Sequence, residues 1–255
     1  MKHLIFLTIF AGFFIFFGSC KNIKPHIVSA DLVTVAATEH SQNNEISTWL
    51  SPFKKRIDEK MGIEIGFSAK ELGQAQKDAS ESLLGNFILD VMNDYAKNHG
   101  LKVDFTITNR GGLRGSLPQG TIKVGNVYEV FPFDNELVVL TLPGKKVEQL
   151  CGEIALQEWQ ITDGIAMCVD NHKAKWVKIN NAPIDTLKNY SVLTTDYLSF
   201  GNDELFALKD YTKIIELKAP LRQAIIDYIK NEYNKGKMID ADFKNQVSVG
   251  QCDNF

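Results

Sequence analysis

Two hydrophobic periodicities alternate along this chain, and they limit what it can fold into more than any other feature does. Apolar side chains recur at helical spacing across residues 46–61, where Gly62 ends the pattern. Residues 63–67 then alternate between apolar and polar, as in a half-buried strand. Since both kinds of element follow each other directly, the pattern predicts a mixed α/β (α+β) domain.

The same alternation continues to the end of the chain. Ser80 is a candidate N-cap for a helix whose apolar face covers residues 83–95, Gly100 ends it, and residues 103–107 form a strand. Without a Pro/Gly/Ser-rich linker or an internal repeat, one domain is expected. The further expected elements are strands at 137–142, 165–169, 173–179 and 190–195, turns at 143–144 and 180–181, a short strand after the second turn, a helix at 145–158, and a helix with Pro220 at its N1 position.

The beginning of the chain has the pattern of an export signal. Residues 4–17 are almost entirely apolar, too few for the roughly 20 residues of a membrane-spanning helix, so a signal peptide at 1–19 is the preferred interpretation over a spanning helix. The small residues before Cys20 resemble the lipobox of bacterial lipoproteins, in which the cysteine is acylated. We therefore expect a lipid anchor at Cys20, a tether over 20–30 and a folded domain over 31–255, exported and held at a membrane, periplasmic or on the cell surface.

Charge and cysteine content exclude several classes of protein. The chain has 28 Lys and Arg against 31 Asp and Glu, a formal charge of −3, so a DNA- or RNA-binding surface is not indicated. Cys151, Cys168 and Cys252 show no C-x-x-C spacing, which argues against a zinc or redox motif. Export permits one disulfide, Cys151 to Cys168 being one candidate, but spacing does not choose among the pairings.

The segment with the strongest chemical signal lies directly after the strand at 103–107. Residues 108–115 read Thr-Asn-Arg-Gly-Gly-Leu-Arg-Gly, where glycines allow close approach of a ligand and Arg114 offers a planar fork for phosphate or carboxylate. Taken alone, Gly-Gly after a strand is more often a bare turn. The segment matches neither the P-loop nor the dinucleotide-binding glycine pattern.

Two aromatic segments follow. Phe133 and Asn135 stand just before the strand at 137–142, where Phe133 is suited to stack on a flat ring, although a core phenylalanine is the better interpretation of that residue by itself. Tyr197 heads a polar loop in which Asp203 is suited to accept hydrogen bonds from sugar hydroxyls, although such a carboxylate is usually a solvated turn residue.

In chain order these segments resemble a known arrangement: Asn-x-Gly-Gly-Leu-Arg at 109–114, Pro-Phe-x-Asn ending at Asn135, and an aromatic with a Gly-x-Asp loop at 197–203. The arrangement is similar to the C-terminal domain of the 5'-nucleotidase family from about residue 49 to 247, and Gly-Asn-Phe at 85–87 resembles that family's helix start. The resemblance implies a single four-layer αββα domain that binds the nucleoside part of a nucleotide, whereas a separate N-terminal metallophosphatase domain supplies two metals and the hydrolysis.

The resemblance also implies roles for six residues. Aromatic stacking contributes about 1–3 kcal/mol per base and tolerates different bases, so broad base selectivity is expected. The implied roles are phosphate contact for Asn109 and Arg114, stacking on the two faces of the base for Phe133 and Tyr197, a hydrogen bond to the base edge for Asn135, and acceptance from ribose hydroxyls for Asp203.

The chain departs from the family pattern at three places. An arginine often found seven positions before the glycine of the helix start is replaced by Asp78, with Lys77 beside it. Tyr197 stands where phenylalanine is usual. The usual Gly-Gly-Asp-Gly becomes Gly-Asn-Asp-Glu at 201–204, which predicts a less open loop.

No catalytic or metal-binding pattern is present in the sequence. A two-metal phosphatase centre needs about half a dozen Asp, His and Asn ligands, and the chain lacks Asp-x-His and Gly-Asn-His-Asp/Glu. No Ser, Cys or Thr is marked as a nucleophile by its context. The five histidines are isolated, with His3 in the signal and His26 in the tether, and we expect those that remain in the domain to be surface residues: His40, His99 and His172.

The sequence therefore predicts a lipid-anchored nucleotide-specificity subunit with no cofactor of its own. A separately encoded metallophosphatase chain carrying two divalent metal ions would complete a 5'-nucleotidase site. One alternative is a non-catalytic surface lipoprotein that captures nucleosides or nucleotides. A second is a structural or adhesive lipoprotein with a decayed pocket, to which the loss of arginine at Asp78 points.

Overall fold

The computed structural model describes residues 44–75, 79–250 and 252. The predicted signal peptide, Cys20 with its tether, and the departures at Lys77 and Asp78 lie outside these described residues. The larger of two compact units is Leu50–Phe255, and the fold below is that of this unit. The other, Met1–Trp49, contributes to the described residues only the first turns of the first helix.

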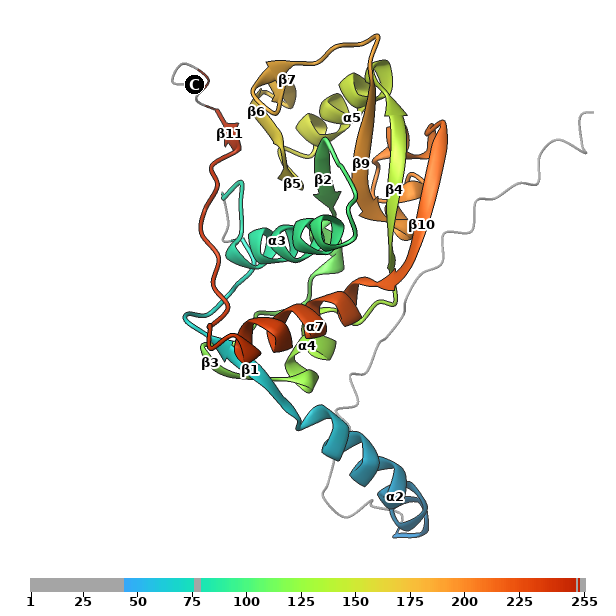
Figure 1. Ribbon diagram of the computed structural model, residues 1–255, viewed down its shortest axis with the longest axis vertical. Coiled ribbons are helices and arrows are strands. Elements are labelled where there is room, and N and C mark those ends of the chain that lie inside the picture. Colours follow the sequence, from blue (N-terminus) through green and yellow to red (C-terminus); the bar gives the residue numbers. More distant parts are fainter. Residues whose placement is uncertain (1–43, 76–78, 251, 253–255) are drawn as a thin grey trace, which may run out of the picture. The chain divides into compact units, whose positions relative to one another are not determined.

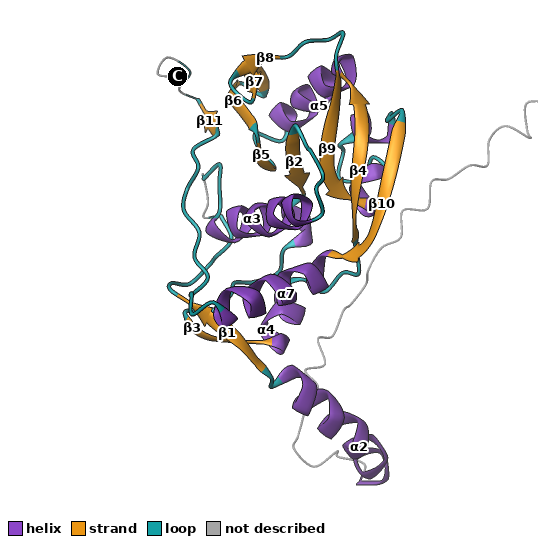
Figure 2. Ribbon diagram, in the orientation of Figure 1, coloured by secondary structure: helices purple, strands orange, loops and turns teal. Residues whose placement is uncertain are grey.

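The four long helices, α2, α3, α5 and α7, form where the sequence places them, with differences at their ends (Figure 2). The N-cap of the helix at 83–98 is Ser82, whose side chain accepts a hydrogen bond from Gly85 N. The prediction of Ser80 as the cap was wrong, because the Ser80 hydroxyl donates instead to Val247 O, 167 residues away. The helices and 3-10 turns are α2 (Asn44–Met61), α3 (Leu83–Asn98), η1 (Arg110–Gly112), α4 (Val124–Val130), α5 (Gly144–Leu156), α6 (Asp196–Ser199), η2 (Phe206–Lys209) and α7 (Leu221–Asn234).

The strands form three sheets. A five-stranded sheet has the order β10-β4-β9-β2-β5, a four-stranded sheet the order β11-β6-β7-β8, and β1 pairs with β3 alone. The strands are β1 (Glu64–Ser68), β2 (Phe105–Thr108), β3 (Gly120–Lys123), β4 (Glu136–Pro143), β5 (Ile161–Asp163), β6 (Ile165–Asp170), β7 (Lys173–Ile179), β8 (Ala182–Pro183), β9 (Asn189–Thr195), β10 (Lys213–Pro220) and β11 (Val247–Val249).

The predicted mixed α/β class is confirmed, and the five-stranded sheet contains both parallel and antiparallel pairs. Its central strand β9 pairs antiparallel with β4 and parallel with β2, a mixed pairing that local hairpins alone do not produce (Figure 1). Asn180 and Asn181 both have positive φ in the β7–β8 turn, as predicted for a tight turn. Pro220 is the N-cap of α7 rather than N1, because it still belongs to β10, where it pairs with Glu136 of β4.

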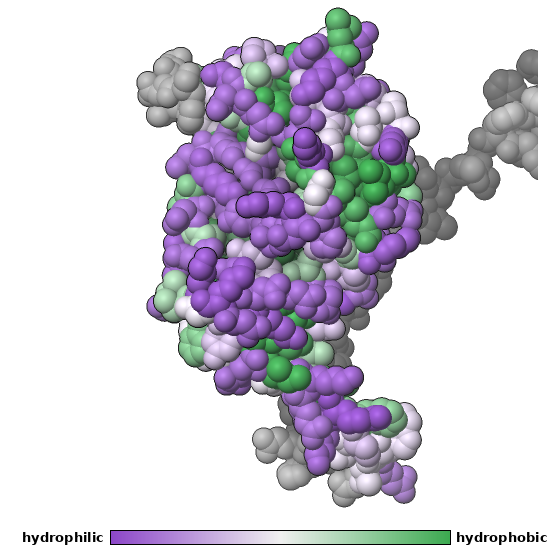
Figure 3. Space-filling view, viewed as in Figure 1, coloured by the Kyte–Doolittle hydropathy of each residue, from purple (hydrophilic) through white to green (hydrophobic). Residues whose placement is uncertain are grey.

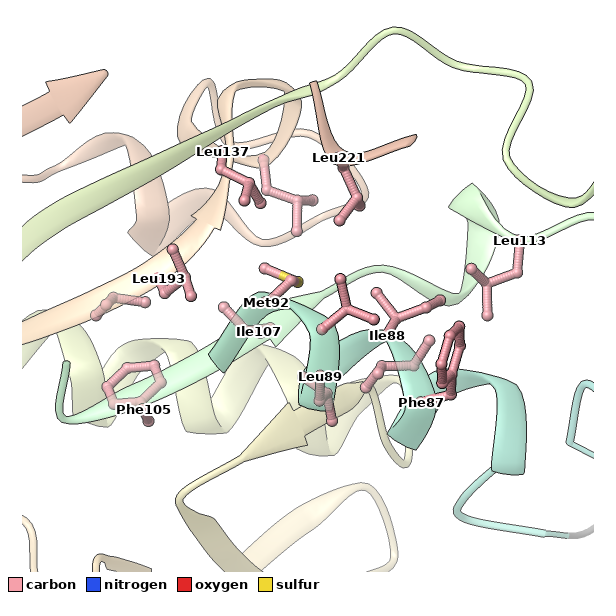
Figure 4. Packing of buried hydrophobic residues seen from close by; sticks show 14 of the residues in the cluster. Phe87, Ile88, Leu89, Met92, Phe105, Ile107, Leu113, Leu137, Leu193 and Leu221 are labelled. Carbon is pink, nitrogen blue, oxygen red and sulfur yellow. The ribbon is translucent and has the colours of Figure 1, made fainter. Parts of the chain in front are cut away.

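The core lies between helix α3 and the five-stranded sheet. Figure 4 shows Met92 and Ile88 of α3 among Ile107, Leu193 and Leu137 of the strands. All five of these side chains are completely buried, which follows from the apolar face predicted for the helix. Helix α5 packs against both larger sheets: it contacts β4 and β9 of the five-stranded sheet and β7 of the four-stranded sheet.

One disulfide joins the C-terminal end of the described chain to the four-stranded sheet. Cys168 of β6 is bonded to Cys252, 84 positions later, just after β11 pairs in parallel with β6. The candidate pair Cys151 to Cys168 was therefore wrong. Cys151 is a buried free thiol on α5, and burial, aided by Glu148, raises its pKa to about 12. A thiol protonated in this way is unreactive at neutral pH.

The face seen in Figure 3 is mostly hydrophilic, with a hydrophobic area over the strands β4, β9 and β10. Among the described residues, no helix combines the length and the apolar character needed to cross a bilayer.

Candidate functional site

Strand β2 places Asn109 at the start of a glycine-containing turn. Asn109 is the N-cap residue of η1 and is only 4% exposed. Its Nδ2 donates a hydrogen bond of 2.5 Å to Oδ2 of Asp203, which is 94 positions away in the sequence. A Cβ atom at Gly111 would lie 3.1 Å from this carboxylate oxygen, and one at Gly112 would lie 3.0 Å from Asn109 Oδ1. The two glycines therefore make room for the contact between Asn109 and Asp203.

Asp203 sits in a strained loop and receives a second hydrogen bond from Tyr197. The Tyr197 hydroxyl donates to Asp203 Oδ1 at 2.8 Å, and this hydrogen bond, with a smaller effect of burial, raises the tyrosine pKa. The tyrosine therefore remains a protonated donor at neutral pH. Asp203 and Glu204 have φ values of 54° and 59°, in the left-handed region that favours glycine. Two side chains therefore orient the carboxylate of Asp203, which is half-buried.

The segment between α4 and β4 presents one aromatic ring to solvent and buries another. Phe131 is 5% exposed and belongs to the core, whereas Phe133 is 46% exposed. The interpretation of Phe133 as a core residue was wrong, because Phe131 takes that position. Phe133, Asn135 and Asn109 line one small pocket, whose other walls are Ile88, Thr108, Gly112, Leu113, Phe131, Leu221 and Arg222.

Arg114 lies over the same aromatic ring. Its guanidinium carbon is 5.5 Å from the centroid of the Phe133 ring, a cation–π distance. Its Nη1 donates to the carbonyl of Gly111 at 2.6 Å, and its own backbone N–H donates to Val130 O at 2.9 Å. The Gly-Gly turn and the Phe133 segment are thus tied together through Arg114.

The structure brings the six residues singled out from the sequence into one connected set. Asn109, Phe133 and Asn135 share a pocket, Asn109 and Tyr197 both donate to Asp203, and Arg114 covers Phe133. Their roles in binding a ligand stay predictions. What the arrangement offers chemically is two partly exposed aromatic rings, one carboxylate held by neutral donors, and an exposed guanidinium.

Sequence reasoning missed two glutamines that bind the backbone of the Asp203 loop and of the Gly-Gly turn. Gln157 Nε2 donates to the backbone carbonyl of Asp203 at 3.0 Å. Gln160 donates to Gln157 Oε1 at 2.7 Å and accepts from the backbone N–H of Arg110 at 3.1 Å. Glutamines carry no motif of their own, and these contacts join segments about 46 to 50 positions apart. No signal in the sequence identifies them.

A larger cleft is also lined by residues of the Gly-Gly turn. It has a volume of about 980 Å³, a size typical of ligand sites, and shares Gly111 and Asp203 with the set described above. Arg110 lies in it with its guanidinium 4.6 Å from the ring centroid of Trp159. Burial lowers the pKa of Arg110, and attraction to Glu158 opposes that shift.

A metal centre is not found among residues 44–75, 79–250 and 252, where His, Cys, Asp and Glu form no group of three or more suited to an ion. His99 and His172 are exposed and each has a ring nitrogen near a backbone carbonyl, as expected of surface residues. His3, His26 and His40 lie outside the described residues.

Comparison with known proteins finds a matching family and several relatives of this chain. Residues 64–210 match the family described as "5'-nucleotidase, C-terminal domain". A cell wall protein of Listeria monocytogenes, Lmo0130, is 26% identical over 233 residues, which cover 82% of this chain and 30% of that protein. Protein UshA of Yersinia enterocolitica is 24% identical over 230 residues, 86% of this chain and 40% of that protein.

The fold agrees with a solved structure of the same kind. The crystal structure of a 5'-nucleotidase precursor from Thermus thermophilus superposes with a TM-score of 0.68 at 25% identity, over 81% of this chain and 43% of that one. The chain thus spans less than half the length of each of these three proteins.

Proposed function

Because the chain belongs to the 5'-nucleotidase C-terminal domain family, we propose that it binds the nucleoside part of a nucleotide at the set of residues around Asp203. The observation that carries this proposal is the convergence of Tyr197 and Asn109 on that carboxylate, beside the exposed ring of Phe133. These groups come from three separated segments and together match the chemical parts of a nucleoside.

The base binds between Phe133 and Tyr197. Both rings are partly exposed, at 46% and 38%, although large aromatic side chains are usually buried. Stacking a base on such a ring contributes about 1–3 kcal/mol and tolerates any base, because every base has a π-face. Asn135, which lines the same pocket as Phe133, contributes both a donor and an acceptor to the base edge.

The ribose hydroxyls donate to Asp203. Each of its carboxylate oxygens accepts one hydrogen bond from a neutral side chain, which leaves further lone pairs for a ligand. No ion pair to Asp203 is found among the described residues. A charged acceptor of this kind favours hydroxyl donors more strongly than a neutral one does.

The phosphates lie toward Arg114 and Asn109. The Arg114 guanidinium is exposed and has no carboxylate partner among the described residues, so that it is available for an anion. A planar fork of N–H donors matches phosphate oxygens in two parallel hydrogen bonds.

Hydrolysis requires a second polypeptide in this proposal. The family match is to a C-terminal domain, and this chain spans 30–43% of the three relatives described above. A metallophosphatase chain with two divalent ions supplies the metal-assisted attack of water on the phosphate, and the present chain supplies specificity.

Export and lipid anchoring at Cys20 are part of the same proposal. The apolar run at 4–17 followed by small residues and Cys20 supports both parts, and the name of one relative as a cell wall protein supports export. Growth of the producing cell with a labelled fatty acid tests the anchor. Label is expected in the wild-type protein, and its persistence in Cys20→Ser would contradict acylation at that residue.

The nucleoside site is tested by calorimetric titration of the purified domain with adenosine and AMP. Phe133→Ala is expected to weaken binding by about 1–3 kcal/mol, roughly 5- to 150-fold. Phe67→Ala is the matched control, since that phenylalanine is 38% exposed and its ring stacks on Tyr233 of α7. Absence of nucleoside binding by the wild-type protein would overturn the proposal.

The two-chain proposal is tested by phosphate release. AMP is incubated with divalent metal and the purified chain, alone or with a metallophosphatase-type chain from the same cell. Release only with both chains is expected. Full activity of this chain alone contradicts the need for a partner, and nucleoside binding without any rate gain from the partner indicates a non-catalytic capture protein.

A further inference from the structure

We infer that Arg222 is a positioning residue that holds the Phe133 ring in place for stacking. This inference rests on the function proposed above. Arg222 is the second residue of α7, which lies beyond residues 64–210 that match the family. Its side chain is only 12% exposed and lines the pocket shared by Phe133, Asn135 and Asn109.

The guanidinium of Arg222 binds the backbone of the segment that carries the ring. Its Nη1 donates to the carbonyl of Phe131 at 2.9 Å and to that of Phe133 at 3.4 Å, and its Nη2 donates to the carboxylate of Asp134. The guanidinium also lies 4.2 Å above the ring centroid of Tyr128 in α4. The fork is therefore fixed from two sides, by a flat ring and by oxygens of three residues of the segment: Phe131, Phe133 and Asp134.

The backbone hydrogen bonds that join residues 130–135 to Arg114 and Leu221 lie at the two ends of this segment. Val130 O accepts from the backbone N–H of Arg114, and Asn135 O accepts from the backbone N–H of Leu221. Between these two ends the described backbone carbonyls of Phe131 and Phe133 are both bound by Arg222. Removing the guanidinium leaves the middle of the segment without these two hydrogen bonds. An exposed ring on a looser segment must then be ordered when a base binds, which lowers affinity.

The ion pair with Asp134 does not account for the arrangement. The Asp134 side chain is 81% exposed, and ion pairs with such a residue contribute little to stability. The guanidinium spreads its contacts over a plane, with Nη1 on the two carbonyls, Nη2 on Asp134 and the flat face on Tyr128, which the point charge of lysine does not reproduce. Arg222→Lys is therefore expected to behave like Arg222→Ala in binding, although it keeps the positive charge.

Adenosine affinity and backbone hydrogen exchange test the inference in the full chain. The affinity is measured for the wild type, Arg222→Ala, Arg222→Lys, Phe133→Ala and the double variant Arg222→Ala/Phe133→Ala. We expect each Arg222 variant to bind about 5- to 10-fold more weakly than the wild type. The double variant is expected to bind no more weakly than Phe133→Ala alone, because Arg222 acts through that ring. Additive losses, or unchanged affinity in a folded Arg222 variant, would overturn the inference.

Hydrogen exchange separates this inference from the proposed function, because it needs no ligand. Amides of residues 131–135 are expected to exchange faster in both Arg222 variants than in the wild type. Gln223→Ala, an exposed neighbour on α7, is the matched control and is expected to leave that exchange unchanged. If the wild type binds no nucleoside, the proposed function fails, and equal exchange in all variants shows in addition that Arg222 does not order the segment. If Arg222→Ala does not fold, Arg222→Lys carries the comparison.

Discussion

Two carboxylates in this domain, Asp163 and Asp203, are each held by several hydrogen bonds, but the charges of their partners differ. Asp163 ends β5 and accepts from Lys244 Nζ at 3.2 Å, from Asn93 and from Gln246. Asp203 accepts from the neutral groups of Tyr197 and Asn109. The charge of Asp163 is therefore balanced within the fold, whereas Asp203 has only neutral partners among the described residues.

The chain segments near the two carboxylates also differ, one in its hydrogen bonds and the other in its backbone strain. We call residues 239–252 the C-terminal strap, a segment that follows α7 and ends at the Cys168–Cys252 disulfide. Glu81 accepts from the backbone N–H groups of Lys244 and Asn245 and so fixes the strap to the start of α3. The loop of Asp203 instead has two consecutive non-glycine residues at positive φ. Backbone strain of this kind is found at binding sites, and stabilising ties are found elsewhere.

The largest expected effect is on the strap. Cys252→Ser removes a disulfide between positions 84 apart, which is expected to lower the free energy of unfolding by about 4 kcal/mol. Urea denaturation measures this loss, and Cys151→Ser, at the free buried thiol, is the comparison that leaves the disulfide intact. Nucleoside affinity under folding conditions is expected to stay the same. A loss of affinity as large as that of Phe133→Ala would show that the strap and the site are coupled.

A smaller loss of stability is expected from Lys244→Met. Lys244 Nζ lies 2.7 Å from Asp90 and 3.2 Å from Asp163, and its side chain is 23% exposed. Removing one partner of a largely buried pair leaves an uncompensated charge, which costs about 3 kcal/mol. Thermal and urea unfolding check the value. An unchanged midpoint contradicts the claim that the charge of Asp163 is balanced by this lysine.

The opposite pattern is expected at the candidate site. Asp203→Asn keeps the shape of the side chain but removes its charge, so that adenosine affinity falls by about 2 kcal/mol, roughly 30-fold. Stability is expected to change by less than about 1 kcal/mol, because no ion pair is broken. The control is Asp227→Asn, an exposed carboxylate on α7, which should leave affinity unchanged. A variant that loses stability and retains affinity reverses the comparison.

Acid distinguishes the strap cluster from the rest of the domain. Burial by itself raises the pKa of Asp163, but attraction to Lys244 and hydrogen bonds from Gln246, Lys244 and Gly164 lower it overall. Since the pKa in the folded state lies below the unfolded value of about 3.9, its contribution is present above that pH and is lost as pH falls through the folded value. In Lys244→Met, the attraction and the hydrogen bond of the lysine are lost, so the pKa of Asp163 rises and this contribution decreases. The stability difference between wild type and variant is therefore expected to shrink below about pH 4, as urea denaturation across pH 3 to 7 can show. A constant difference contradicts the assignment.

The smallest expected effect concerns the strained loop. Glu204→Gly relieves a φ of 59° and is expected to stabilise the domain by roughly 0.5 kcal/mol, since relief of strain is partly offset by the added freedom of the unfolded chain. Glu158→Gly, at a φ of 70°, provides a comparison outside that loop. A loss of stability in Glu204→Gly shows that the Glu204 side chain makes a contact worth more than the strain.

Much of the fold could be predicted because its elements follow from local periodicity. The faces of α3 and α5, the strands β1, β4, β6, β7 and β9, and the Asn180–Asn181 turn all appear within a few residues of their expected places. The segments that sequence reasoning missed are β3, α4, β5, α6, β10, β11 and the two 3-10 turns. β10 is an edge strand with an irregular register before Pro220, and β11 depends on pairing with a strand about 80 residues earlier. Their cause is tertiary, so local pattern does not reveal them.

The same division applies to the candidate site. Motif resemblance identified residues that the structure brings together, such as Asn109 and Asp203, because each stands in a segment with its own recognisable pattern. Arg222 and Gln157 stand in no such pattern and act on backbone carbonyls far away in the sequence. The disulfide could not be chosen for a similar reason, since only the pairing of β11 with β6 brings Cys252 to Cys168.

The central claim is that Phe133 and Tyr197 enclose a base while Asp203 holds the ribose. A crystal structure of the domain soaked with adenosine tests it most directly. We predict the purine between these two rings and ribose hydroxyls within hydrogen-bond distance of the Asp203 carboxylate. Adenosine bound elsewhere, with both rings and the carboxylate untouched, would contradict the account.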